Sequence, residues 1–117
     1  MSRKVSLKKR LLGTKMNWQF HIENLQNGNT VSFRPKGNSM QPKIESGNLV
    51  TVSPDTSSLS EGDIVFCKVN GNYYVHLVKA KKTEGDKKLF LIGNNKGGIN
   101  GWVTQTSIFG KVTDISS

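Results

Sequence analysis

The stretch GNSMQPKIESGNLVTV, residues 37–52, combines a glycine-containing turn with an apolar, β-branched run. Ser39 lies between Gly37 and Pro42, and the stretch ends in the run 49–52. Glycine permits tight turns and β-branched residues favour strands, so this stretch predicts a turn followed by a strand. The serine is either a residue that stabilises the turn or a nucleophile that the turn exposes.

Short apolar or alternating runs continue on both sides of this stretch. Strands are expected at residues 29–36, 48–54, 64–69, 72–80, 88–93 and 107–115. Asn70-Gly71 is a strong hairpin signal between two of these runs, and a loop around Gly85 joins the next two. The glycine-rich segment 94–102 is expected to be irregular. Six or seven short strands separated by turns indicate a mainly β fold, coiled or barrel-like.

The residues before the first strand divide into two parts. The segment 17–28 has apolar residues at helical spacing and a terminal glycine, which predicts a short helix, with one short strand as the alternative. Residues 1–16 carry many basic side chains and no acidic ones. We therefore expect a basic N-terminal arm at 1–16 and a single β domain at 17–117.

The chain has 117 residues and a formal net charge of +9, and much of the excess lies in the arm. The candidate nucleic-acid contacts there are Arg3, Lys4, Lys8, Lys9 and Arg10. Clustered basic residues release counterions on binding, so non-specific contact with nucleic acid is one interpretation and a solvated tail is the other. No helix-turn-helix pattern, zinc spacing or RNA-binding aromatic signature supports sequence-specific reading. The lysines of 79–88, which Glu84 and Asp86 dilute, have the same two interpretations: a charged hairpin loop, or contact with nucleic acid or another polyanion.

The single cysteine, Cys67, excludes an intramolecular disulfide and a cysteine-based metal cluster. It lies in an apolar run, where a small buried hydrophobe is expected. No uncharged apolar stretch approaches the ~20 residues that span a bilayer. The sequence therefore predicts a soluble cytoplasmic protein without cofactor, metal or membrane partner, and it leaves a homodimer open.

A nucleophilic serine needs a base, oxyanion donors and an exposed hydroxyl. Gly37 would allow both the turn and the close approach of a substrate strand, and amides around Asn38, Ser39 and Met40 are candidate oxyanion donors. The candidate bases are His76 and nearby lysines. The other histidine, His21, is assigned a surface or packing role.

The alternation of side chains along a strand separates these bases. His76 shares one face with Tyr74 and Val78, and Lys79 lies on the other, so the two cannot both point at Ser39. An imidazole titrates near ~6.5 and a lysine near ~10.4, which favours His76 at neutral pH. The residues alone leave a turn serine and a structural histidine as the ordinary alternative.

Three segments resemble the S24/S26 serine peptidases, which include the LexA-like self-cleaving repressors and the signal peptidases. Residues 37–52 resemble G-x-S-M-x-P-x-I-x-x-G-D-x-V-x-V. Residues 61–65 (EGDIV) resemble the family's second segment, and residues 74–78 (YVHLV) resemble the strand that carries the general base. The resemblance covers residues 30–115 and implies a coiled, mostly β fold.

In the histidine type of this superfamily, the resemblance implies that Ser39 attacks a peptide or protein substrate and His76 takes its proton. Gly37 and Pro42 are then the expected substrate contacts. A G-D-N-N segment supplies an aspartate to the histidine in that type. Here IGNN at 92–95 places Asn94 at that position, where it would orient the imidazole without a charge.

Other departures from the pattern bear on function. Asn48 replaces a second aspartate, and Asp63 or Asp86 are alternative partners for the histidine. The chain has no Ala-Gly or Cys-Gly dipeptide, the bond that LexA-like proteins cleave, and no DNA-binding domain precedes the peptidase-like part. The resemblance is therefore to stand-alone members from phage and bacterial genomes.

Three hypotheses follow from the sequence. The first is an active serine peptidase, an endopeptidase or a self-processing protein, that uses Ser39 and His76. The second is a binding or structural module on the same fold with weak or no activity, motivated by asparagine at the acid positions. The third is a nucleic-acid-associated protein that acts through the basic arm, and it is compatible with either of the others.

Overall fold

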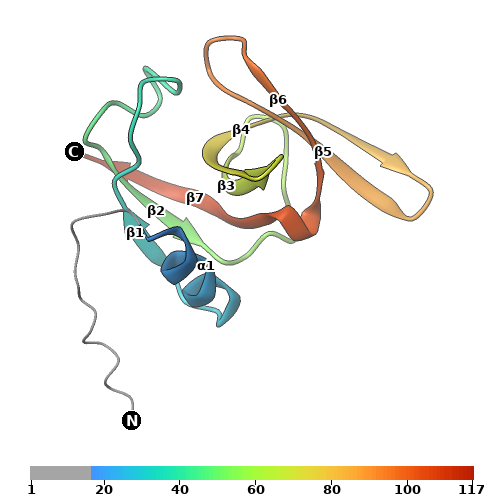
Figure 1. Cartoon of the computed structure of the whole chain (residues 1–117), viewed down its shortest axis with the longest axis horizontal. Helices are drawn as coiled ribbons and strands as arrows, with labels where there is room; N and C mark the ends of the chain where they lie inside the picture. Colours follow the sequence, from blue (N-terminus) through green and yellow to red (C-terminus); the bar gives the residue numbers. More distant parts are fainter. Residues whose placement is uncertain (1–16) are drawn as a thin grey trace.

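One coiled antiparallel sheet dominates the computed structural model, which describes residues 17–117 (Figure 1). The elements are α1 (Trp18–Gln26), β1 (Val31–Phe33), β2 (Leu49–Ser53), β3 (Ile64–Val69), β4 (Asn72–Glu84), β5 (Lys87–Gly93), β6 (Ile99–Thr104), the 3₁₀ helix η2 (Gln105–Ser107) and β7 (Ile108–Ser116). The strand order is β1-β2-β7-β3-β4-β5-β6. The expected mainly β fold with six or seven strands and a short N-terminal helix is confirmed.

The segment before β1 forms the helix α1 rather than the alternative strand. Its N-terminus is capped by Asn17, whose side-chain oxygen accepts a hydrogen bond from the Phe20 amide at 3.0 Å. Ile22 and Leu25 lie one turn apart and are both buried, so the apolar stripe of the helix faces the sheet. The helix thereby closes one side of the core (Figure 1).

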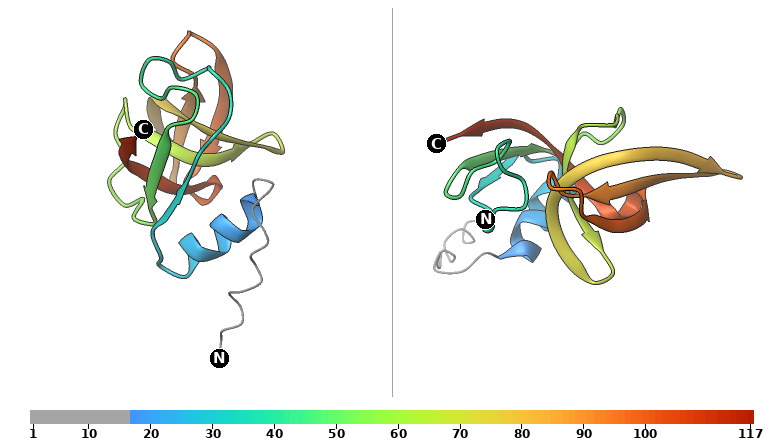
Figure 2. Two further views of the ribbon diagram at one scale, coloured as in Figure 1. Left: turned by 90° about the vertical axis from the view of Figure 1, so that its left-hand side faces the viewer. Right: turned by 90° about the horizontal axis from the view of Figure 1, so that it is seen from above.

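The central strands are buried on both faces because the sheet coils around itself (Figure 2). Along β4, Val75 and Leu77 belong to one apolar cluster, with residues of α1, β1 and β2. Val78 belongs to a second cluster with Val65 and Phe90, and Tyr74 packs against it. Two-sided burial explains why β3 reads as a continuous apolar run instead of an alternating one.

Two expectations about the second half of the chain are wrong. The glycine-rich segment 94–102 is not irregular throughout, because residues from Ile99 onward form β6, which pairs with β5. Glycine has low strand propensity, but backbone pairing with a buried neighbour overrides it. The lysines of 79–88 do not form a loop either, since β4 and β5 pair as far as Glu84 and Lys87.

The basic arm and its five candidate nucleic-acid contacts lie outside the described residues. Within residues 17–117, no helix is long and apolar enough to cross a membrane. Cys67 is fully buried in the second apolar cluster, and burial raises the pKa of its thiol to about 12. The thiol is therefore neutral and packs as a small hydrophobe.

Gly110 generates a prediction about stability, because β7 packs closely against β2 and α1 there. A Cβ at this position would lie 2.5 Å from both the Ser53 carbonyl oxygen and Val52 Cγ1. We expect Gly110→Ala to lower the free energy of unfolding by about 1–3 kcal/mol through overpacking. Urea unfolding measures this loss, and Asp114→Ala, an exposed change on the same strand, is the control. Equal stability of the two variants would contradict the close packing of β7 against β2 at Gly110.

Candidate active site

Ser39 lies in a turn between β1 and β2 and points at a histidine from β4. Gly37, which precedes it, has a φ of +99°, a conformation that glycine adopts without strain. Ser39 Oγ lies 3.0 Å from His76 Nε2, which is hydrogen-bonding distance. Met40 follows the serine and is buried in the first apolar cluster, so it fixes the turn against the core.

His76 is buried at the middle of β4, with 7% of its surface exposed. Its ring stacks on Tyr74, with 4.7 Å between the ring centroids. Burial lowers the pKa of His76 below its usual value, because the charged imidazolium loses its hydration. A hydrogen bond to Asn100 opposes this shift but is the smaller effect. The imidazole is therefore neutral at neutral pH.

The residue that orients the imidazole is Asn100, on β6, and not Asn94. Asn100 Oδ1 lies 2.7 Å from His76 Nδ1. This oxygen only accepts hydrogen bonds, so Nδ1 carries the proton and Nε2 presents its lone pair to Ser39. The side chain reaches β4 at the point where β5 ends, at Gly93.

Asn94 has a different task, which explains why the expected assignment is wrong. Its side-chain oxygen accepts hydrogen bonds from the Lys96 and Gly98 amides, both at 2.8 Å, and so closes the turn between β5 and β6. Its carbonyl oxygen accepts a bond from Lys79 Nζ at 3.0 Å. Lys79, which strand alternation placed on the face opposite His76, thus binds this carbonyl.

Asn95 ties this turn to the serine. Its amide donates to the Ser39 carbonyl oxygen at 3.0 Å, and its side-chain nitrogen donates to the Gln41 carbonyl oxygen at 2.9 Å. These two bonds fix the backbone on both sides of Met40. Sequence reasoning missed both Asn95 and Asn100, although each belongs to the glycine-rich segment that was expected to be irregular.

The acidic alternatives are not at the site. Asp63 Oδ2 accepts from the Ser60 amide and lies 3.4 Å from Lys111 Nζ, and Asp86 lies at the tip of the β4–β5 hairpin. Asn48, at the position of a family aspartate, accepts from the Glu45 amide at 2.7 Å. An amide oxygen closes that turn as a carboxylate would, so the substitution at this position leaves the fold intact.

A groove of about 480 Å³ opens beside Ser39 and His76. Its walls include three aromatic rings, Trp18 from α1 and Tyr73 and Tyr74 from β4. Gly37 lines the groove, as a residue close to substrate would. Pro42 and Asn38 are exposed and do not line it, so the expected contact between Pro42 and substrate has no support in the groove's shape.

The chemistry available here is proton transfer between a hydroxyl and a neutral imidazole. The amides of Ser39 and Met40 make no hydrogen bond within residues 17–117, so both can donate to a ligand. In the same part of the chain, no group of three or more His, Cys, Asp or Glu side chains could hold a metal ion.

His21 lies on α1, away from the serine. Its ring stacks on Phe33 with 4.7 Å between centroids, and its Nδ1 is buried without a hydrogen-bond partner. Burial lowers the pKa of His21, as it does for His76. The packing role assigned to this residue from sequence agrees with its contacts.

The lowered pKa values of both histidines predict that the protein loses stability in mild acid. The unfolded chain takes up protons as the pH falls below 6.5, before the folded protein does, so the free energy of unfolding decreases there. His21→Phe keeps a ring against Phe33 and removes one titration. Urea unfolding between about pH 7.5 and pH 5.5 should show a smaller loss for this variant. An unchanged loss would contradict a neutral, buried His21.

The comparison with protein families agrees with the three sequence segments and with the fold. No curated protein matches the chain. The model of the family described as Peptidase S24-like matches residues 7–113, which is nearly the full length of the chain. The chain, with its coiled antiparallel sheet and the Ser39 turn beside β4, belongs to the Peptidase S24-like family.

Proposed function

We propose that this protein is a serine peptidase in which Ser39 is the nucleophile and His76 the general base. The observation that carries the proposal is the chain of contacts from Asn100 Oδ1 to His76 Nδ1, at 2.7 Å, and from His76 Nε2 to Ser39 Oγ, at 3.0 Å. The base accepts the hydroxyl proton as the oxygen attacks the scissile carbonyl, and it later donates this proton to the leaving amine.

The negative charge that develops on the carbonyl oxygen needs donors. The amides of Ser39 and Met40 are positioned by the Asn95 bonds and lack partners within residues 17–117, so they form the proposed oxyanion hole. Asn38 is proposed as a supporting residue at the edge of this turn. Asn94 supports it indirectly, by closing the turn that carries Asn95.

The substrate is proposed to be an extended peptide that adds to the sheet. Within residues 17–117, β1 is an edge strand that pairs with β2 alone, and the chain continues from it through Gly37 to the serine. A peptide beside 31–37 would use the free backbone groups of that edge and would carry a side chain into the aromatic groove. Trp18 and Tyr73 favour an apolar side chain there.

Active-site labelling tests the roles of Ser39 and His76. A fluorophosphonate probe should label the wild-type protein, fail to label Ser39→Ala, and label His76→Ala about 10²–10⁴-fold more slowly, because the general base is lost. Ser46→Ala, an exposed serine in the same connection between β1 and β2, is the matched control and should label normally. Equal labelling of all four proteins would overturn the assignment.

The Asn100 contact predicts a shift in the pH profile. Asn100→Asp places a carboxylate against Nδ1, which stabilises the imidazolium and raises the pKa of His76. The acid limb of the labelling rate, which lies below pH 6.5 in the wild type because the base must be neutral, should therefore move to higher pH. A pH series of the labelling rate measures the shift. A pH profile identical to that of the wild type would contradict the contact between Asn100 and His76 on which the proposal rests.

The second candidate function is a binding or structural module on the same fold. It is favoured by one observation, the neutral amide of Asn100 where histidine-type relatives are expected to use an acid. This candidate predicts that Ser39→Ala retains full biological function, whereas the peptidase predicts its loss. Contact of the basic arm with nucleic acid stays a prediction that is compatible with both candidates.

A further inference from the structure

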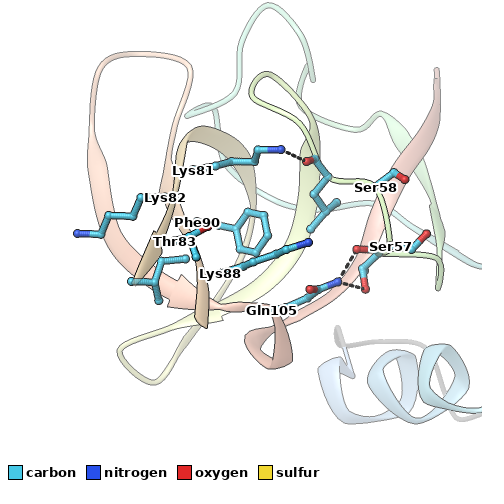
Figure 3. A pocket seen from close by; sticks show the side chains of 11 residues that line it. Ser57, Ser58, Lys81, Lys82, Thr83, Lys88, Phe90 and Gln105 are labelled. Atoms are coloured by element: carbon cyan, nitrogen blue, oxygen red, sulfur yellow. Dashed lines mark hydrogen bonds between the residues drawn. The ribbon is translucent and has the colours of Figure 1, made fainter. Parts of the chain in front are cut away.

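A second hollow, of about 330 Å³, lies between the β4–β5 hairpin, the loop 56–59 and η2 (Figure 3). It shares no lining residue with the groove beside Ser39. Its lining includes three lysines and several hydroxyl residues but no aspartate or glutamate. An excess of positive charge in a concave site favours an anionic ligand.

Strand register explains why two of the lysines face this hollow. Lys81 lies opposite Phe90, and Lys88 lies opposite Thr83. Side chains two residues apart on a strand share a face, so Lys81 and Lys88 are diagonal neighbours above the buried ring of Phe90. Lys82 is on the other face, where its amine lies 4.4 Å from the Trp102 ring centroid, and Figure 3 shows it pointing outward.

The walls of the hollow are joined by hydrogen bonds. Lys81 Nζ donates to the Leu59 carbonyl oxygen at 2.9 Å, and Gln105 Nε2 donates to the Thr56 carbonyl oxygen at 2.6 Å (Figure 3). Leu59 is itself buried. The loop is thus held to both β4 and η2, and the hollow is a preformed feature of the fold.

Within residues 17–117, no carboxylate forms an ion pair with Lys81 or Lys88 in the hollow. The Lys88 side chain makes no hydrogen bond or ion pair within residues 17–117, and the side-chain bond of Lys81 is to a neutral carbonyl. Glu84 pairs with the outward-facing Lys82 at 3.1 Å. Asp55, the acid in the neighbouring loop, accepts hydrogen bonds from the Ser57 amide at 3.0 Å and from the Ser57 hydroxyl at 2.6 Å.

We propose that this hollow binds the phosphate monoester group of a small organic molecule. A monoester carries about −1.5 to −2 charges near neutral pH, which matches the two lysine charges. Lys88 and Lys81 would donate charge-assisted hydrogen bonds to the phosphate oxygens. The volume is within the range of small-molecule sites, so it leaves room for the organic group over Phe90. This site does not depend on the proposed peptidase activity.

A titration followed by NMR tests the site in the full chain. Inorganic phosphate and adenosine 5′-monophosphate should each shift the amide signals of 56–59 and 87–90 to saturation. Lys88→Gln, which removes no side-chain hydrogen bond or ion pair within residues 17–117, should raise the dissociation constant about tenfold or more, because one charge-assisted bond is lost. Lys81→Gln should weaken binding to a similar extent and also broaden signals from the loop that it holds.

Lys43→Gln is the matched control, since it removes the same charge from an exposed lysine outside the hollow. It should change the dissociation constant less than about twofold, as expected for a distant surface charge in salt. Equal weakening by Lys43→Gln and Lys88→Gln would overturn the site and indicate attraction to net charge alone. Single-stranded DNA without a terminal phosphate carries phosphodiesters but no monoester. Binding of this DNA without binding of the mononucleotide would overturn the monoester assignment. Ser39→Ala should bind both ligands as the wild type does.

Discussion

The two hydrogen bonds that Asn95 makes to the Ser39 and Gln41 carbonyl oxygens are the contacts on which the site depends. The serine turn lies in a connection of fifteen residues between β1 and β2, from 34 to 48, and has no sheet pairing of its own. Met40 anchors it from below and Asn95 fixes it from the side. Without this fixation, the hydroxyl would have no set distance to a ring on another strand, and orientation supplies much of the rate in such chemistry.

The segment between β5 and β6 therefore serves both partners of the proposed reaction. Asn94 closes the turn, Asn95 binds the backbone on both sides of Met40, and Asn100 binds the imidazole of His76. All three groups are neutral amides. A neutral partner sets the tautomer of His76 as an acid would, but it stabilises the imidazolium less, so its upward effect on the pKa does not offset the lowering that burial causes. This combination keeps the imidazole of His76 neutral at neutral pH.

One strand, β4, carries two different environments. Its first half is buried between two apolar clusters and places His76 where water is scarce. Its second half leaves the core, pairs with β5 alone among the described strands, and carries lysines on alternating faces. The change coincides with an irregularity in pairing between Val78 and Ala80. Strand β4 thus carries the buried His76 in its first half and lysines that line the basic hollow in its second half.

The sequence by itself determined the features that depend on local pattern. Alternation and turn residues predicted the β class and the Asn70-Gly71 hairpin, because side-chain period and glycine geometry are properties of short segments. They favoured a helix before β1 but left a short strand as the alternative. Strand parity separated His76 from Lys79, and the resemblance of three segments pointed to Ser39 and to the family. These inferences needed no knowledge of which strands are neighbours.

Only the tertiary structure decided which amide meets the histidine and where the hairpin lysines face. Asn94 was the residue expected from the aligned motif, but its side-chain oxygen accepts hydrogen bonds from two amides of its own turn. The histidine is instead bound by Asn100, on strand β6, which the glycine-rich sequence did not predict. Strand β6 forms because its backbone pairs with the edge of β5. Local strand propensity does not encode this pairing between separate segments. The faces of Lys81 and Lys88 likewise follow from register across the hairpin, and the loop that encloses them lies more than twenty residues away in sequence.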